Sequence, residues 1–326
     1  MNLRASLMAY RRLHEESVQH PDPSAQTGAS AVKAYYAFVT QSYLRGWGES
    51  FHLAPRQRHE SRMESLHRLE YYLAARLGLT PGQHVLDVGC GVGGPMRSIA
   101  RFSGATVTGI TISPDQVAIG NKLNRRDGLA RQCTCLEGDF MTMQLPDASF
   151  DAAYTIEALC HATDRAVVFS EIHRVLRPAG LLVGVDQCMT SLYDDKNEKQ
   201  RRIKRGIELG SGIANLTGQH ELKMALQTSG FELIEARDLI AEACQEMPIP
   251  WYAPLLGQGD GLRGLVKTRG ARGVIKAIVL LLEQIHMVPS GSYESLRLLN
   301  LAADSLIAAG KAKIFTPSFF FLARKL

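Results

Sequence analysis

The stretch LDVGCGVGGPM, which begins at Leu86, constrains the fold more than any other part of the chain. An apolar run, HVLDVG, leads into it, and an amphipathic run that begins MRSIARF follows it. Glycine adopts backbone conformations that other residues avoid, so a glycine-rich turn between a strand and a helix lets a ligand approach the backbone closely. Gly89, Gly91 and Gly94 match the G-x-G-x-x-G spacing of nucleotide-type cofactor loops, which is a weak signal by itself.

Short apolar runs continue downstream of this loop and alternate with amphipathic stretches. They read ATVTGITI, CTCLEGDF, FDAAYTIEA and LLVGVDQCM, and two more strand-like runs, GFELIEARDLI and FTPSFFFLARK, follow. Strands that alternate with helices favour a doubly wound, Rossmann-like α/β sheet. We predict four segments: an N-terminal helical cap (1–80), a cofactor-binding core (81–240), a helical substrate lid (241–312) and a last strand that completes the core sheet (313–326).

The end of the second predicted strand decides which cofactor the loop would bind. A dinucleotide site normally has a carboxylate there to bind the ribose, but this chain has Thr111. Two other acids flank the loop region: Asp87 lies two residues before the first glycine, and Asp139 ends the third predicted strand. The pattern therefore favours a different adenosyl cofactor over NAD, with a simple tight turn as the alternative for the glycines alone.

Composition excludes several classes of protein. Of the 326 residues, 45% are hydrophobic and 21% are charged, as in an ordinary globular chain, and a net charge of +5 does not demand a nucleic acid partner. The six cysteines show no C-x-x-C spacing, and the N-terminus lacks the apolar core of a signal peptide. We therefore expect a reduced, cytoplasmic protein, and we predict no metal site.

One basic stretch leaves two interpretations open. The longest apolar run, AIVLLL at Ala277–Leu282, is far shorter than a membrane span, which needs about 20 residues. The surrounding sequence, GLRGLVKTRGARGVIKAIVLLLEQI, combines apolar residues at roughly helical spacing with five basic ones: Arg263, Lys267, Arg269, Arg272 and Lys276. A solvated basic face on a packed helix is favoured, and peripheral contact with a membrane is the alternative.

A family resemblance rests on six blocks of sequence. The run Leu86-Asp-Val-Gly-Cys-Gly-Val-Gly-Gly resembles the cofactor loop of class I S-adenosylmethionine (SAM) methyltransferases. In chain order, from about Tyr35 to the C-terminus, the chain is similar to sterol 24-C-methyltransferases at GWGESFH, VGCGVGGP, IEALCH, IELGSGI, PWYAPL and FTPSFFFLARK. Two departures fall near groups that the resemblance places against the substrate: Leu44 replaces an acid, and Val185-Asp186-Gln187 replaces Tyr-Glu-Trp.

The resemblance implies SAM as methyl donor and S-adenosyl-L-homocysteine as product. In that family the glycines let the backbone approach the methionine part of SAM, and an aspartate, here Asp139, binds the adenine amino group. The residues that we expect to contact the cofactor are Tyr36, Asp87, Gly89, Cys90, Gly91, Thr111, Gln116, Asp139, Phe140 and Glu157.

Methylation of an alkene leaves a carbocation, which sets the demands on the substrate pocket. Aromatic faces stabilise such a cation by about 2 kcal/mol each when desolvated, and water would capture it. We expect Trp47, Phe51, Trp251 and Tyr252 to form the walls, although Trp47 as a core anchor is the alternative. A base must then remove a proton. The candidate catalytic residues are Tyr43, His52, Glu157, His161, Asp186 and Glu208.

Three functions compete on this basis. The favoured one is C24 methylation of a sterol side chain, with an apolar sterol or isoprenoid as the small-molecule partner and no nucleic acid. A prenyl diphosphate or other terpenoid alkene is the second, for which Asp194-Asp195 and the basic run from Arg201 to Arg205 would bind magnesium and diphosphate. The third is a sterol-binding or lipid-binding protein without catalysis. Assembly as a homo-oligomer stays open.

Overall fold

The computed structural model describes residues 3–19, 26–243, 249–258 and 268–326, and its centre is a seven-stranded sheet. The strand order is β3-β2-β1-β4-β5-β7-β6. Five neighbouring strands run parallel: β1 (His84–Val88), β2 (Thr106–Thr111), β3 (Cys133–Glu137), β4 (Phe150–Ile156) and β5 (Leu176–Met189). The last strand, β7 (Phe315–Lys325), inserts antiparallel between β5 and β6 (Phe231–Asp238). The predicted doubly wound α/β fold is confirmed.

Two apolar cores lie on opposite faces of this sheet. On one face, strand side chains pack against α3 (Arg62–Arg76) and α4 (Gly94–Ser103), with α5 (Pro114–Arg126) beside them. On the other face they pack against α6 (Arg165–Val175) and α8 (Gln219–Thr228). Phe320 joins the first core and Phe321 the second, because successive strand residues point to opposite faces. That alternation explains the continuous apolar run in β7.

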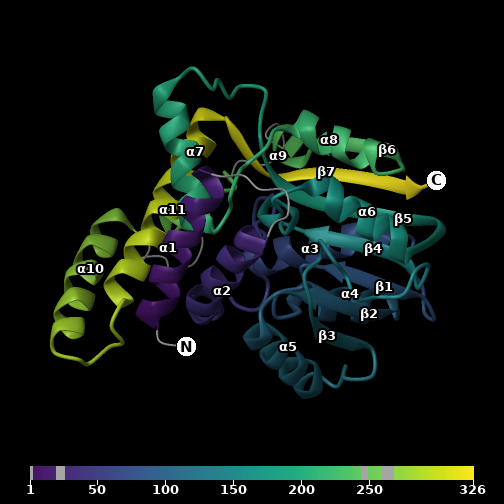
Figure 1. The fold of residues 1–326 in the computed structure, drawn as a ribbon, viewed down its shortest axis with the longest axis horizontal. Helices are drawn as coiled ribbons and strands as arrows, with labels where there is room; N and C mark the ends of the chain where they lie inside the picture. The colour runs from purple at the N-terminus through teal and green to yellow at the C-terminus, as the bar shows by residue number, and fades with distance from the viewer. Residues whose placement is uncertain (1–2, 20–25, 244–248, 259–267) are drawn as a thin grey trace.

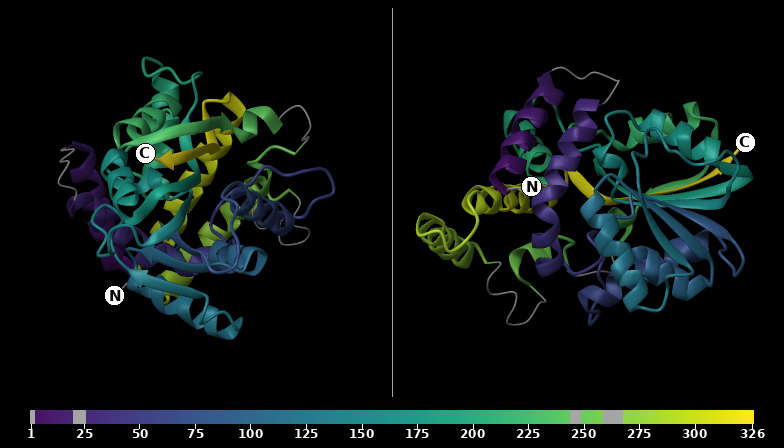
Figure 2. Two further views of the ribbon diagram at one scale, coloured as in Figure 1. Left: turned by 90° about the vertical axis from the view of Figure 1, so that its right-hand side faces the viewer. Right: turned by 60° about the horizontal axis from the view of Figure 1, so that its bottom comes forward.

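A group of helices stands beyond the carboxyl ends of the parallel strands (Figures 1 and 2). It contains α1 (Leu3–Gln19), α2 (Gln26–Gly46), α7 (Glu198–Ser211), α10 (Arg269–Gln284) and α11 (Ser292–Ala312). Here α1 packs on α2, and α11 packs on both α7 and α10. The long helix of the predicted lid is therefore packed together with helices from the predicted cap and core. The short elements η1 (Leu159–His161), α9 (Leu239–Ala243) and η2 (Ala253–Leu256) lie in the connections.

Two further sequence expectations concern membrane-spanning helices and the cysteine thiols. Among the described residues, none of the helices has the length and hydropathy that a bilayer crossing requires. Cys90, Cys133, Cys135, Cys160 and Cys188 are buried free thiols, and Cys244 lies outside the described residues.

Candidate functional site

The glycine loop after β1 is shaped by close contacts with its own surroundings. Gly89 has a φ of 85°, and a Cβ there would lie 2.3 Å from the Cβ of Ala158. The amides of Gly89 and Cys90 both donate to the carbonyl of Ile110, at 3.0 and 2.9 Å. These contacts hold the loop against the end of β2, so only glycine fits at position 89.

The segment that follows α2 packs directly on this loop. A Cβ at Gly94 would lie 2.2 Å from the Glu49 carbonyl oxygen, so the two backbones touch. The buried guanidinium of Arg97, in α4, donates to the Glu49 carboxylate at 2.7 Å and to the Val92 carbonyl at 2.9 Å. Gly48 permits the turn before Glu49 with a φ of 87°. The Gly-Trp-Gly block thereby fixes residues 49–53 over the loop.

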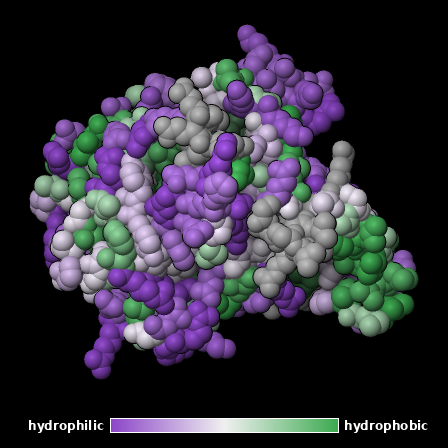
Figure 3. Space-filling model, turned by 180° about the vertical axis from the view of Figure 1, so that it is seen from behind, coloured by the Kyte–Doolittle hydropathy of each residue, from purple (hydrophilic) through white to green (hydrophobic). Residues whose placement is uncertain are grey.

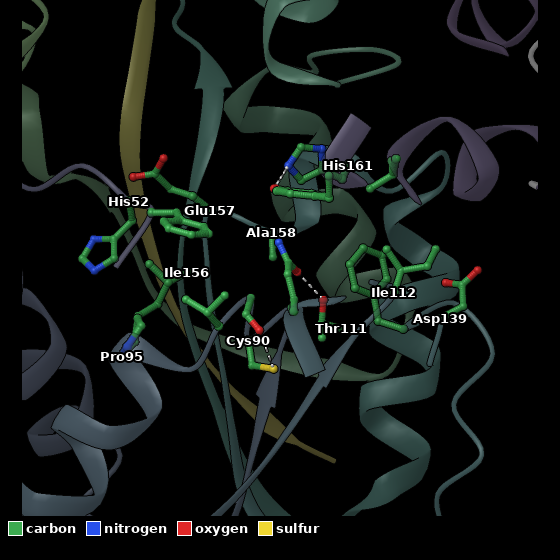
Figure 4. A pocket seen from close by; sticks show the side chains of 18 of the residues that line it. His52, Cys90, Pro95, Thr111, Ile112, Asp139, Ile156, Glu157, Ala158 and His161 are labelled. Atoms are coloured by element: carbon green, nitrogen blue, oxygen red, sulfur yellow. Dashed lines mark hydrogen bonds between the residues drawn. The ribbon is translucent and has the colours of Figure 1, made fainter. Parts of the chain in front are cut away.

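A cleft opens at the carboxyl ends of β1, β2 and β4, and we call it the cofactor cleft (Figure 4). Thr111 donates to the Gln116 amide oxygen at 2.6 Å, and the Gln116 amide donates to Thr40 of α2 at 3.3 Å. Asp139 lies across the cleft from Glu157 in Figure 4. Of the residues predicted to contact the cofactor, the structure brings nine to its walls: Tyr36, Gly89, Cys90, Gly91, Thr111, Gln116, Asp139, Phe140 and Glu157.

Asp87, the tenth, lies behind the loop and does not line the cofactor cleft. Its side chain is buried, and the Tyr154 hydroxyl donates to it at 2.8 Å. Burial raises the pKa of Asp87 to about 7, against the lowering effect of that hydrogen bond. The structure thus gives Asp87 a supporting place beneath the loop instead of the predicted direct contact.

A second cleft, which we call the apolar cleft, adjoins the first on the side of the helices. Its walls come from α2, from the segment after it, from β5 and from α11. None of the described residues that line it is a lysine or an arginine. Four residues line both clefts: Tyr36, Phe51, Glu157 and His161. A ligand in one cleft can therefore meet a ligand in the other at these side chains.

Glu157 lies where the two clefts meet, and its backbone conformation is unusual. Its φ is 49°, a conformation that a residue with a side chain rarely adopts. Its carboxylate accepts from the Leu53 amide at 2.6 Å and from the Gln187 side chain at 2.8 Å. Burial raises the pKa of Glu157 to about 7, although the charge of His52 and these two hydrogen bonds oppose the change. A carboxylate with such a pKa is poised to accept a proton near neutral pH.

His161 and Tyr36 form a hydrogen-bonded pair beside Glu157. His161 Nδ1 lies 2.9 Å from the Gly212 carbonyl, which can only accept, so Nδ1 carries the proton. Burial lowers the pKa of His161 to about 4, so the ring is neutral and Nε2 accepts from the Tyr36 hydroxyl at 2.9 Å. His161 can accept another proton only if Tyr36 gives up this bond.

His52 lines the cofactor cleft, but its hydrogen bonds are wrong for the predicted role of base. Nε2 faces the Glu70 carboxylate at 3.0 Å, and Nδ1 faces the Leu53 carbonyl at 3.1 Å. Both partners only accept, so both ring nitrogens donate. Burial would lower the pKa of His52, but the hydrogen bond and charge of Glu70 outweigh it and the pKa is raised. A ring that already carries both protons cannot take a third.

Two other predicted catalytic acids line neither cleft. Asp186 is buried on the face of β5 opposite to Gln187, and its carboxylate lies 3.7 Å from the Arg165 guanidinium. Glu208 accepts from the Leu216 amide at 2.9 Å and contacts Lys204 at the same distance, which stabilises the turn after α7. The structure therefore does not bring either acid to the place where the two clefts meet.

The predicted aromatic walls separate into two groups. Tyr43, Trp47 and Phe51 line the apolar cleft, and the Tyr43 hydroxyl lies 2.6 Å from that of Tyr35. Trp251 and Tyr252 line a different hollow, where the Trp251 ring packs 5.5 Å from the ring of Phe315. The structure places both residues beside the start of β7 and outside the apolar cleft, although Trp251 also lines a small hollow with Trp47 and His52.

The sequence analysis missed several residues of the apolar cleft. Gln187 was identified only as a departure from a family pattern. Because successive strand residues point to opposite faces, its position next to Asp186 in β5 could have predicted that the two side chains face opposite ways. The cleft wall from α11 went unnoticed because its small and aliphatic side chains look like ordinary core: Leu299, Ala302, Ala303 and Leu306.

Comparisons with known proteins agree with this geometry. Residues 86–184 match the family model described as "Methyltransferase domain", and residues 262–325 match "Sterol methyltransferase C-terminal". The chain is 43% identical over 294 residues to cycloartenol-C-24-methyltransferase of Arabidopsis thaliana, covering 90% of this chain and 86% of that protein. It is 39% identical over 302 residues to sterol 24-C-methyltransferase ERG6 of Saccharomyces cerevisiae, covering 90% and 78%.

Solved structures of lower identity share the fold. The [4+2]-cyclase SpnF superposes with a TM-score of 0.68 at 22% identity, covering 90% of this chain and 95% of that one. Geranyl diphosphate C-methyltransferase from Streptomyces coelicolor A3(2) superposes with a TM-score of 0.66 at 17% identity, covering 94% and 100%.

Proposed function

Because the chain belongs to the family of sterol 24-C-methyltransferases, which are SAM-dependent C-methyltransferases, we propose that it methylates the side-chain alkene of a sterol at C24. One observation supports this most: the cofactor cleft and the apolar cleft meet at Tyr36, Phe51, Glu157 and His161. Methyl transfer needs the donor and the acceptor carbon about 3–3.5 Å apart and in line. Two adjoining clefts with shared side chains meet that need.

The residues of the cofactor cleft fit SAM. Gly89 and Gly91 line the cleft without side chains, so a ligand can lie against their backbone, and the Asp139 carboxylate can accept from an adenine amino group. Thr111 and Gln116, which form a hydrogen bond at the end of β2, would offer a hydroxyl and an amide to the ribose hydroxyls. When bound there, SAM supplies a methyl group that is already activated as a sulfonium. The protein must therefore position the reactants and exclude water.

The apolar cleft has the properties that a carbocation requires. Tyr36, Tyr43, Trp47 and Phe51 offer aromatic rings, and a ring face stabilises a desolvated cation by about 2 kcal/mol. Glu157 is the base that we propose. A proton from a carbon beside the cation passes to its carboxylate, and the electrons of that C–H bond become the new double bond. The shifted pKa of Glu157 suits this step, because a proton acceptor works best near the ambient pH.

The second candidate, a prenyl diphosphate substrate, receives less support. A diphosphate would need basic side chains or a metal at the cleft. No lysine or arginine is among the described residues that line the apolar cleft, and no group of three possible metal ligands occurs in the described part of the chain. Asp194 and Asp195 are exposed before α7 and line neither cleft.

The experiment uses methyl-deuterated SAM with three substrates in parallel: a Δ24 sterol, its saturated counterpart, and a short prenyl diphosphate with magnesium. Mass spectrometry of the products should show the labelled methyl on the Δ24 sterol alone. Label on the prenyl diphosphate alone would refute the sterol assignment. The third candidate, a sterol carrier without catalysis, would bind sterol but give no heat on titration with SAM.

We further propose that α10 contacts a lipid bilayer. Its outward face is an apolar stripe at helical spacing, which projects from the molecule in Figure 3. Val274, Ile278, Leu281 and Ile285 are 62%, 50%, 58% and 54% exposed, and Met287 just beyond the helix is 71% exposed. Its inward face packs on α11, the helix that forms part of the apolar cleft.

A bilayer explains this stripe better than a second copy of the chain. A stable interface between proteins buries about 800 Å² on each partner, whereas the exposed apolar stripe follows a single helix of 16 residues. Lys276 of the same helix suits anionic headgroups, whereas Arg272 faces α11 and pairs with Asp304 at 2.7 Å. Arg263 and Lys267, which completed the predicted basic stretch, lie outside the described residues. A bilayer is also where an insoluble sterol would be found.

Sedimentation with vesicles tests the contact. The protein should bind vesicles that contain anionic lipid, and the double variant Ile278→Ser, Leu281→Ser should bind about tenfold more weakly. Leu192, 59% exposed before α7, provides the control Leu192→Ser, which should bind like the parent. Unchanged vesicle binding by the double variant, or a dimer that this variant dissociates, would refute membrane contact through α10.

A further inference from the structure

Gln187, near the end of β5, brings an amide to the apolar cleft for which the reaction described above has no role. Its Nε2 donates to the Glu157 carboxylate at 2.8 Å. A carboxylate only accepts hydrogen bonds, so the NH₂ group faces Glu157 and the amide oxygen faces away from it. That oxygen is buried, and among the described residues it has no hydrogen-bond partner.

A buried amide at this position lowers the stability of the fold unless its oxygen also has a partner. A buried polar atom without a partner costs about 1–3 kcal/mol, and an aliphatic side chain would fill the same space without that cost. Phe51 and Ile213 nearby have no donor in their side chains, and the indole N–H of Trp47, which could donate, makes no hydrogen bond to this oxygen. The position is also one where the resemblance expects tryptophan. The group that interacts with the amide oxygen must therefore come from the ligand of the cleft.

We propose that Gln187 is a positioning residue for the methylation, which rests on the proposed function above. Its NH₂ group orients the Glu157 carboxylate and favours its ionised form, and its carbonyl oxygen faces the carbocation. The alkene's π electrons form the bond to the methyl carbon, and the electron pair of the broken carbon–sulfur bond stays on sulfur. The cation then lies beside the negative end of the amide dipole until Glu157 accepts the proton.

Several elements place titratable groups near Glu157, and the effect of Gln187 on this carboxylate can be tested separately from theirs. The other titratable groups around it come from α2, from the segment after α2, from η1 and from β5, and they are Tyr36, Tyr43, His52, Cys160, His161 and Asp186. Among the described residues, the Gln187 side chain makes one hydrogen bond, to Glu157, while its backbone amide donates to the Asp186 carboxylate at 2.8 Å and would do so in any variant. A change at Gln187 therefore acts first on this carboxylate.

The first test needs no substrate. In protein labelled with carbon-13 at the glutamate carboxyls, the Glu157 signal is identified by its loss in Glu157→Gln and is titrated by NMR. Gln187→Met keeps the length of the side chain and removes the donor, so the titration midpoint should rise by about one pH unit or more. Gln227→Met, the same change on the exposed face of α8, should leave it unmoved. An unmoved midpoint in Gln187→Met would overturn the inference.

Turnover provides the second test. Gln187→Met should lower kcat about tenfold to a hundredfold, shift the acid limb of its pH profile upward, and leave KM for SAM unchanged, since Gln187 does not line the cofactor cleft. Part of the product should be an alcohol, from capture of the less stabilised cation by water. Weaker SAM binding with an unshifted profile would indicate a merely structural residue and overturn the inference. A parent enzyme inactive on the Δ24 sterol would refute the proposed function, while the titration still decides the role of Gln187.

Discussion

The two clefts are built in different ways. The cofactor cleft is shaped by close backbone contacts: a glycine loop, the ends of three parallel strands, and the segment at Glu49 against Gly94. The apolar cleft is formed by side chains from α2, β5 and α11, which are far apart in the chain. A cleft shaped by close backbone contacts tolerates few substitutions, and it fits ligands of only one shape. A wall of side chains can change its ligand by single substitutions, and the departure at Gln187 lies in that wall.

The largest expected effect comes from a substitution in the glycine loop of the cofactor cleft. Gly89→Ala should weaken SAM binding roughly a thousandfold or more, because the new Cβ would lie 2.3 Å from Ala158 and the φ of 85° is strained for alanine. Calorimetry measures the affinity. Gly128→Ala separates the two causes, because Gly128 has a φ of 72° but no atom within 4 Å of its added Cβ. This control should lose only about 1 kcal/mol of stability and bind SAM normally. Normal SAM binding by Gly89→Ala would contradict the difference drawn between the clefts.

The same difference explains what the sequence could predict. The loop glycines follow from local spacing, and the resemblance supplies Asp139, which lies at the same edge because every parallel strand delivers its carboxyl end there. Residue type alone could not assign Trp251 and Tyr252 to a hollow, because long-range packing against β7 decides it. Asp186 and Gln187 differ by one step along β5, and strand parity turns one toward Arg165 and the other into the cleft.

At the junction of the clefts, Glu157→Gln should lower kcat about a hundredfold, because the amide cannot accept the proton. In the parent, the carboxylate must be ionised to act, and its pKa is about 7. Activity should therefore fall as the pH drops below about 7, and this limb should vanish in the variant. The control Glu208→Gln removes a carboxylate outside both clefts and should keep kcat and its pH profile. An identical acid limb in Glu157→Gln would show that another group is the base.

Tyr36 tests how much the junction depends on one hydrogen bond. Tyr36→Phe removes the donor to His161 Nε2 and should lower kcat about tenfold, since a buried acceptor is left without a partner. Tyr35→Phe is the matched change one residue earlier. Tyr35 itself lines neither cleft, although its hydroxyl bonds that of Tyr43 in the wall of the apolar cleft as well as the Gly210 carbonyl, so that variant should lose stability and less activity than Tyr36→Phe. Equal losses of kcat in the two variants would point to a general effect of the helix α2.

The smallest expected effect tests the boundary of the apolar cleft. Tyr252 shares an aromatic sequence block with Trp251, but both line the hollow beside Pro55 and Phe315, away from Glu157. Tyr252→Phe should change kcat and KM less than twofold, because no hydrogen bond of its hydroxyl holds either cleft in place among the described residues. Steady-state kinetics with the Δ24 sterol measures this. A tenfold rise in KM would mean that a long sterol reaches from the apolar cleft into this hollow, and the substrate site would then extend to the start of β7.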